Sequence, residues 1–89
     1  MPDSPIFVKV YDLLAWLLPR TLKFPREYRF TLVVRIHTCA LNLQRTLVQA
    51  AKAGSREENT ALRQADIELA ELRLLLRLST DLRILELRG

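Results

Sequence analysis

Glycine and cysteine are scarce in this 89-residue chain, and each scarcity excludes a class of protein. The two glycines, Gly54 and Gly89, are too few for glycine-rich phosphate loops, doubly wound sheets or β-sandwiches, all of which depend on tight turns. The single cysteine, Cys39, excludes a disulfide framework and a cysteine zinc site, and it fits a reducing compartment.

Long apolar runs are also missing from the sequence. The longest one, Leu13 to Leu18, is far shorter than the ~20 residues that a membrane-spanning helix needs. Charged residues (Asp3, Lys9 and Asp12) interrupt the only stretch that resembles a signal peptide. We therefore expect a soluble, cytoplasmic protein without a membrane partner.

Apolar residues nevertheless make up 49% of the chain. A protein of 10.3 kDa forms one small domain, here residues 1–89, and leaves no room for a catalytic domain beside it. A chain this short buries only about 60–65% of the surface that its unfolded form exposes. This combination predicts an all-α protein whose long helices share apolar faces, with a partner covering some of those faces.

Three helices are predicted, at about residues 5–18, 26–53 and 56–82. The first begins at Pro5, with Ser4 as its N-cap. It should end or kink near Leu18, because Pro19 would clash with the carbonyl group of Ala15.

The second predicted helix is the most regularly amphipathic, and we expect Gly54 to end it as a left-handed residue. Its apolar residues are spaced alternately four and three apart, as in a helical bundle. They form the expected core seam: Leu32, Ile36, Cys39 or Ala40, Leu43, Leu47 and Ala50. A polar stripe lies opposite: Arg35, Thr38, Asn42, Arg45, Gln49 and Lys52.

The third predicted helix opens with a capping box, in which Ser55 and Glu58 satisfy each other's free backbone donors. Its core seam is Leu62, Ala65, Leu69, Leu72, Leu76 and Ser79. From Leu72 onward, leucines lie on several faces around Arg73 and Arg77, which indicates burial on several faces. The pattern leaves open whether residues 82–89 extend this helix or turn away from it.

Short loops between long helices predict antiparallel neighbours, and hence an up-down helical bundle. Three helices do not cover all the leucines of the third, so we expect the chain to form a homo-oligomer. The interface residues that we expect are Trp16, Leu74, Leu75 and Leu78. A monomeric three-helix bundle with a wide core is the alternative.

The net charge of +4 is concentrated in residues 26–54, which carry five basic residues and one acidic residue. Cations cluster at the entrance of the second helix, where Arg20, Lys23, Arg26 and Arg29 face only Glu27. Cations at a helix N-terminus oppose the helix dipole, so stability alone would favour acidic residues there. Arginine outnumbers lysine eleven to three, and its planar guanidinium suits phosphate or carboxylate groups.

This distribution predicts an anionic partner, either nucleic-acid phosphates or an acidic protein surface. The candidate binding residues are Arg20, Lys23, Arg26, Arg29, Arg35, Arg45, Lys52, Arg73 and Arg77. Arg73 and Arg77 repel each other, because they lie four residues apart on one helix face. The alternative is that these cations form only a solvated face.

No combination of residues predicts an active site. His37 is the only histidine, and Cys39 lies on a different side of the same predicted helix. A di-metal bundle would need Glu-x-x-His pairs on facing helices, which the sequence lacks. We therefore expect a protein that is not an enzyme and that has no cofactor, metal ion or small-molecule substrate.

Two stretches of the sequence indicate a protein family more specifically than the composition or the hydrophobic periodicity does. The first runs from Asp12 to Leu32, followed by Arg35 and Ile36, and contains the block Trp-Leu-Leu-Pro…Lys-Phe-Pro-Arg…Arg-Phe. The second runs from Leu69 to Leu82. Together they resemble the accessory variability determinant (Avd) proteins of diversity-generating retroelements, over about Val8 to Leu85.

The resemblance implies a four-helix bundle that assembles into a ring-like homopentamer with a basic surface. It also implies a non-enzymatic accessory protein that binds a reverse transcriptase and nucleic acid (RNA template or cDNA) and supports mutagenic retrohoming. The family's inter-helix motif falls on Pro19, Lys23, Phe24, Pro25, Arg26, Arg29 and Phe30. Its Leu-Arg-x-Leu-Leu-Arg-Leu pattern falls on Arg73 and Arg77.

Two features depart from the family pattern. Members usually continue into a fourth helix after the position of Leu85, so we expect three clear helices and a shortened or missing fourth. Val33 also occupies a position where a glycine is expected. The alternatives are a structural oligomerisation module of the ribosomal intervening-sequence four-helix-bundle type, which would dock an acidic protein, or a shortened relative that folds but has lost its function.

Overall fold

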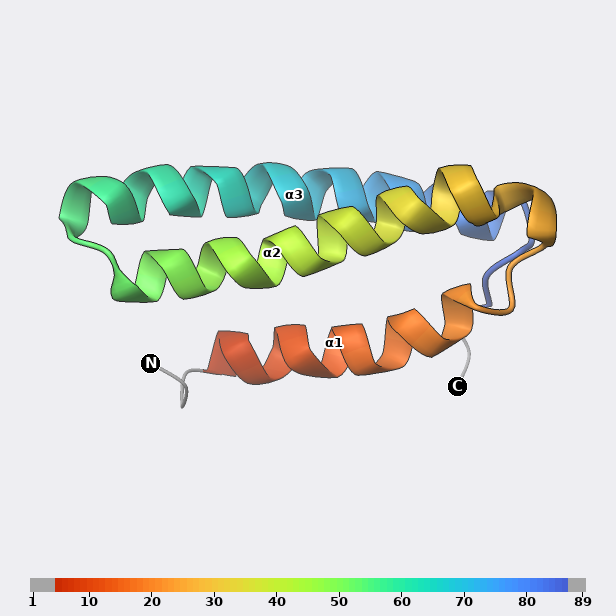
Figure 1. Ribbon diagram of the computed structural model, residues 1–89, viewed down its shortest axis with the longest axis horizontal. Coiled ribbons are helices and arrows are strands. Elements are labelled where there is room, and N and C mark those ends of the chain that lie inside the picture. Colours follow the sequence, from red (N-terminus) through yellow and green to blue (C-terminus); the bar gives the residue numbers. More distant parts are fainter. Residues whose placement is uncertain (1–4, 87–89) are drawn as a thin grey trace.

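Three long helices make up most of the computed structural model, which describes residues 5–86 (Figure 1). They are α1 (Pro5–Thr21), α2 (Val34–Lys52) and α3 (Ser55–Asp81). None of residues 5–86 lies in a β-strand, so the predicted all-helical fold is confirmed for them. The molecule measures 42 × 22 × 18 Å, and its long axis matches the ~40 Å that an α-helix as long as α3 spans. In this part of the chain, no helix combines the length and the apolar character that a membrane crossing requires.

Helices α2 and α3 form an antiparallel pair, and α1 lies along the other side of α2 (Figure 1). The core lies between them: Leu17, Ile36, Ala40 and Leu72 are at most 1% exposed and belong to one apolar cluster. The seam predicted for α2 is therefore buried along most of its length. The seam predicted for α3 is wrong at its start, because Leu62 is 43% exposed.

Helix α1 continues through Pro19 and ends at Thr21, three residues beyond the end that the sequence predicts near Leu18. A proline in the last turn removes only one backbone hydrogen bond, and the Thr21 hydroxyl stabilises the turn by donating to the Leu18 carbonyl at 2.8 Å. Thr21 Oγ1 also lies 2.6 Å from Nε2 of His37 on α2. Both contacts are satisfied when His37 donates to the Thr21 oxygen, so this partly buried pair ties the end of α1 to α2.

The segment between α1 and α2 is not the regular α-helix that the sequence predicts from residue 26. Arg26–Tyr28 form a 3-10 turn (η1), and Arg29–Val33 form a π-helical turn (η2). A π turn accommodates an extra residue and rotates the residues before it relative to the helix that follows. As a result two consecutive residues, Leu32 and Val33, are both buried, whereas Phe30 is 83% exposed. Val33 is the residue that replaces the expected glycine.

Both predicted caps at the turn between α2 and α3 are wrong. Gly54 has φ −71° and ψ 171°, an extended conformation that other residues also adopt, so it is not a left-handed residue. Gly54, rather than Ser55, is the N-cap of α3, and no side-chain hydrogen bond caps this helix. The Gly54 carbonyl accepts a hydrogen bond from the Glu58 backbone N–H at 2.8 Å instead. Glu57 and Glu58 still lie in the first turn, where their charge favours the helix dipole.

The chain after α3 turns back toward α1 and does not extend the helix. Residues 82–86 are not helical, and Leu85 is buried in the core at 5% exposure. Of the two directions that the sequence left open, the chain therefore turns away from α3, as far as residue 86. The predicted N-cap Ser4 and residues 87–89 lie outside the described residues.

Leu72→Ala should lower the free energy of unfolding by about 3 kcal/mol, because it opens a cavity where Leu72 is 1% exposed. Ile67→Ala, on the same helix at 59% exposure, should lower it by less than about 1 kcal/mol. Urea unfolding followed by circular dichroism measures both losses. Equal losses would contradict the core as described.

Candidate nucleic-acid interface

Four predicted cations lie along the chain that leaves α1 and enters α2, and we call Arg20, Lys23, Arg26 and Arg29 the basic end. This segment lies beside the end of α3, at the opposite end of the bundle from the α2–α3 turn (Figure 1). Arg20 is half-buried and the other three are exposed. Within residues 5–86 none of the four forms a salt bridge. The structure therefore gathers unpaired positive charge at one end of the molecule.

Arg20 is held in place by Trp16. Its Cζ lies 4.3 Å from the centroid of the Trp16 ring, in a cation–π contact. Its Nη1 donates to the Trp16 carbonyl at 2.8 Å. A guanidinium has five N–H donors, so these contacts leave donors free for an anion. Trp16 itself is half-buried and packs against the core, and its place at an oligomer interface stays a prediction.

The other predicted cations lie along α2 and α3. Arg45 and Lys52 are exposed on α2, with Lys52 at the far end of the helix. Arg73 is exposed on α3. Arg77 Nε lies 4.0 Å from Asp81 Oδ2, one turn further along α3, in a weak surface ion pair. These residues are therefore spread over the length of the bundle.

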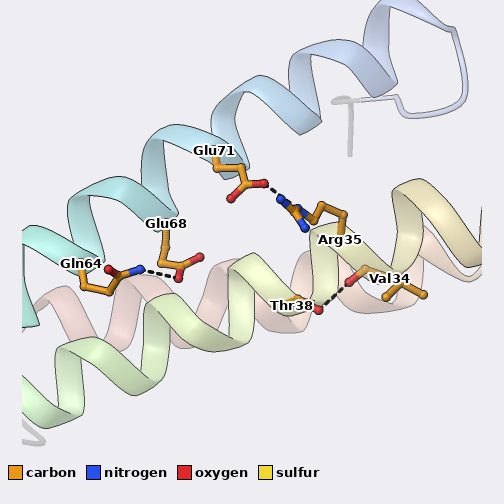
Figure 2. A network of polar contacts seen from close by, with 6 residues as sticks. All are labelled: Val34, Arg35, Thr38, Gln64, Glu68 and Glu71. Carbon is orange, nitrogen blue, oxygen red and sulfur yellow. Dashed lines mark hydrogen bonds and ion pairs between the residues drawn. The ribbon is translucent and has the colours of Figure 1, made fainter.

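Arg35 joins α2 to α3 in a salt bridge (Figure 2). Its Nε donates to Glu71 Oε2 at 2.6 Å. This hydrogen bond, followed by one from the Cys39 thiol, lowers the pKa of Glu71 below its ordinary value of 4.5. The same hydrogen bond to Glu71 raises the pKa of Arg35. An arginine that is already paired with a carboxylate has fewer free N–H donors for phosphate. The main role of Arg35 is therefore to join α2 to α3.

A group of possible metal ligands lies next to this salt bridge, formed by Cys39, Glu68 and Glu71, whose ligand atoms are within 4.8 Å of one another. Burial, followed by the hydrogen bond to Glu71, raises the pKa of the Cys39 thiol to about 12. Metals bind the thiolate, so the raised thiol pKa makes Cys39 a weaker ligand than an ordinary cysteine. Glu71 is paired with Arg35, and Glu68 accepts a hydrogen bond from Gln64 at 2.9 Å (Figure 2). Cys39 thus packs as the small core residue that the sequence predicts.

Apolar side chains on α3 remain uncovered by the described chain. Leu74 and Leu78 are 66% and 47% exposed. A groove of about 450 Å³ beside them is lined by Tyr28, Thr31, Leu32, Arg35, Leu75, Leu78 and Leu82. Of the four predicted interface residues, the structure brings Leu75 and Leu78 together in this groove. It leaves Leu74 on the outer surface of α3 and places Trp16 on α1.

One further cation reaches the basic end, and the sequence did not predict it. Arg83 lines a cleft of about 460 Å³ together with Arg20 and Lys23. This neighbourhood depends on the direction of the chain after α3, which the apolar pattern left open. No local motif in the sequence signals it.

The fold and these side chains define a small helical bundle protein with a basic end and uncovered leucines. The model of the bAvd-like family matches residues 6–88, and the chain belongs to this family. Searches of the curated proteins and of the solved structures gave no match. Family membership confirms the resemblance to Avd proteins, and it indicates an accessory, non-catalytic protein of retroelements.

Glu71→Gln should destabilise the protein at pH 7, because it removes the charged partner of Arg35. The pKa of Glu71 is lowered in the folded state, so its contribution is present above the unfolded pKa and is lost as the pH falls through the folded pKa. The wild type and the variant should therefore become equally stable in acid. Urea unfolding at pH 7 and at a pH below the Glu71 pKa tests this.

The matched control is Asp66→Asn, which removes an exposed α3 carboxylate that forms no salt bridge within residues 5–86. A stability difference for Glu71→Gln that persists in acid would show that the salt bridge is not its source.

Proposed function

We propose that this protein is the accessory protein of a diversity-generating retroelement. It acts as a non-enzymatic subunit that binds the reverse transcriptase and nucleic acid and thereby supports mutagenic retrohoming. The nucleic acid is the RNA template or the cDNA copied from it. The observation that carries the proposal is the basic end, present in a chain that belongs to the bAvd-like family.

The chemistry of the basic end supports binding to phosphate groups. Arg26 and Arg29 are exposed and have no ion-pair partner in the described part of the chain. A guanidinium binds phosphate through two parallel hydrogen bonds, and such contacts release the counterions of the strand. Phosphate contacts carry no sequence information. A protein that follows a template through mutagenic copying must hold changing sequences, and this mode of binding meets that requirement.

Apolar surface supports the protein contacts. The uncovered leucines of α3 favour self-association, and we propose a ring-like homo-oligomer, a pentamer by resemblance to the Avd family. A second groove, of about 660 Å³, lies between α1 and α2 and is lined by Phe7, Val8, Tyr11, Gln44, Val48, Ala51 and Lys52. Tyr11 is 65% exposed and Val8 52% exposed, so this groove offers apolar surface to a protein partner, which we propose to be the polymerase.

The double reversal Arg26→Glu and Arg29→Glu should weaken binding to single-stranded RNA at least about tenfold, because it replaces two phosphate donors with two repelling carboxylates. Adding Arg20→Glu and Lys23→Glu should abolish binding. Fluorescence anisotropy over a series of salt concentrations measures the affinity, and circular dichroism checks that the helices remain.

The control is the reversal Arg56→Glu and Arg63→Glu on the first half of α3, which changes the net charge equally but lies away from the basic end. If the two double variants lose equal RNA affinity, binding depends on the net charge of the protein and not on the basic end. Wild-type protein that captures the polymerase but no nucleic acid would favour the alternative, a module that docks an acidic protein.

Light scattering behind a sizing column should give a mass of about five times 10.3 kDa for the wild type. Leu74→Lys with Leu78→Lys should reduce it to that of one chain, because both positions are exposed in the single chain and charge is poorly tolerated in an apolar interface. A wild type that is a monomer would contradict the proposed assembly.

A further inference from the structure

Arg83 has a backbone conformation that residues with a Cβ rarely adopt. Its φ is 63°, and no other residue between 5 and 86 has a positive φ. Its N–H donates to the Thr80 carbonyl at 3.0 Å, and the Ile84 N–H donates to the Ser79 carbonyl at 3.0 Å. This pair of hydrogen bonds is the Schellman motif that ends many helices, and its left-handed position is normally glycine.

Ending the helix does not account for an arginine at this position. Glycine makes the same turn without steric strain, whereas a residue with a Cβ is strained in the left-handed region. The turn is nevertheless well anchored, because Leu85 is 5% exposed and Ile84 packs against the core. A strained residue held by its surroundings points to a role for its side chain.

Arg83 lines a cleft at the basic end. Figure 1 shows the chain after α3 returning beside the end of α1. The cleft between them holds about 460 Å³ and is lined by Pro19, Arg20, Lys23, Arg83, Ile84, Leu85 and Glu86. Three of these residues are cations and one, Glu86, is acidic. The Trp16 contacts hold Arg20 and the Schellman turn holds the Arg83 backbone, so less ordering is needed when an anion binds.

We propose that this cleft binds a phosphodiester group of a nucleic-acid strand, with Arg20, Lys23 and Arg83 as the donors. The left-handed backbone conformation of Arg83 is strained, and this strain accompanies the placement of its guanidinium in the cleft. The inference rests on the proposed nucleic-acid binding and adds to it the cleft and a binding role for Arg83. Arg26 and Arg29 follow Lys23 along the chain, so a strand that leaves the cleft meets further cations, which suits a backbone charged at every nucleotide.

The test uses the full chain, fluorescently labelled single-stranded RNA, a DNA strand of the same sequence, and polyglutamate. Arg83→Gly removes the guanidinium and the backbone strain together. Its melting temperature should rise by about 4 °C, because glycine relieves the left-handed conformation. Its RNA affinity at low salt should fall about tenfold, and the slope of log affinity against log salt should decrease by about 0.7. DNA should give the same pattern, because the phosphodiester is shared.

Three further variants test how the affinity for RNA depends on the charges in the cleft. Arg83→Lys keeps the charge and should retain part of the affinity. Glu86→Gln removes the acidic side chain from the cleft and should tighten RNA binding about twofold. Arg63→Gln removes one exposed charge from the first half of α3 and, as the matched control, should change the affinity less than about twofold.

If Arg83→Gly melts at a higher temperature but binds RNA as tightly as the wild type, the cleft is not the phosphodiester site. This outcome would not contradict the proposed function. A wild type that binds neither strand would overturn both. Polyglutamate that binds the wild type as tightly as RNA does, and that loses affinity with Arg83→Gly, would assign the cleft to an acidic protein instead. A lower melting temperature for Arg83→Gly would show that the backbone of Arg83 is not strained in the wild type.

Discussion

Burial of one apolar seam between α2 and α3 determines where everything else in this protein lies. Ile36 and Ala40 on α2 and Leu72 on α3 are almost completely inaccessible to solvent, and the hydrophobic effect makes this contact the main source of stability. The two helices differ in length, with 19 residues in α2 and 27 in α3. The last turns of α3 therefore extend past the regular part of α2, beside η1 and η2. Leu74 and Leu78 remain uncovered because they lie on faces of α3 that the rest of the described chain does not cover, whereas Ser79 in the same turns is fully buried.

The same arrangement gathers the positive charge at one end. Helix α1 adds its core residue Leu17 to the seam, and the partly buried Thr21–His37 pair ties the end of α1 to α2. Arg20 lies in the last turn of α1, and the chain that then crosses to α2 carries the other three cations of the basic end, all of them exposed. The chain after α3 returns to the same place because Leu85 is buried in the core. Two segments that are distant in the sequence, the α1–α2 connection and the chain after α3, thus meet at the end that we propose to hold nucleic acid.

Features that depend on regular spacing could be predicted from the sequence. The alternation of four and three from Leu32 to Ala50 identified most of the buried residues of η2 and α2, although it missed Val33 and Thr46. The crowding of leucines after Leu72 identified Leu74 and Leu78 as uncovered. Four cations of the candidate site are close in sequence, so their clustering required no knowledge of the fold.

Features that depend on contacts between distant residues could not be predicted in this way. Arg35 looked like a free cation of the polar stripe, but its partner Glu71 is on another helix. Thr21 stabilises the turn after Pro19 partly through His37, which no local pattern reveals. Arg83 reaches the basic end only because the chain turns back after α3, and a left-handed arginine gives no signal in the sequence.

The proposed nucleic-acid interface is the end formed by the α1–α2 connection and residues 83–86. Hydrogen–deuterium exchange of the wild-type protein, with and without single-stranded RNA, tests it most directly, because it compares all parts of the chain in one experiment. The account predicts slower exchange on RNA binding in residues 20–33 and 82–86, and little change around the turn at Gly54. Protection centred on the Gly54 turn, or no protection by RNA at all, would contradict it.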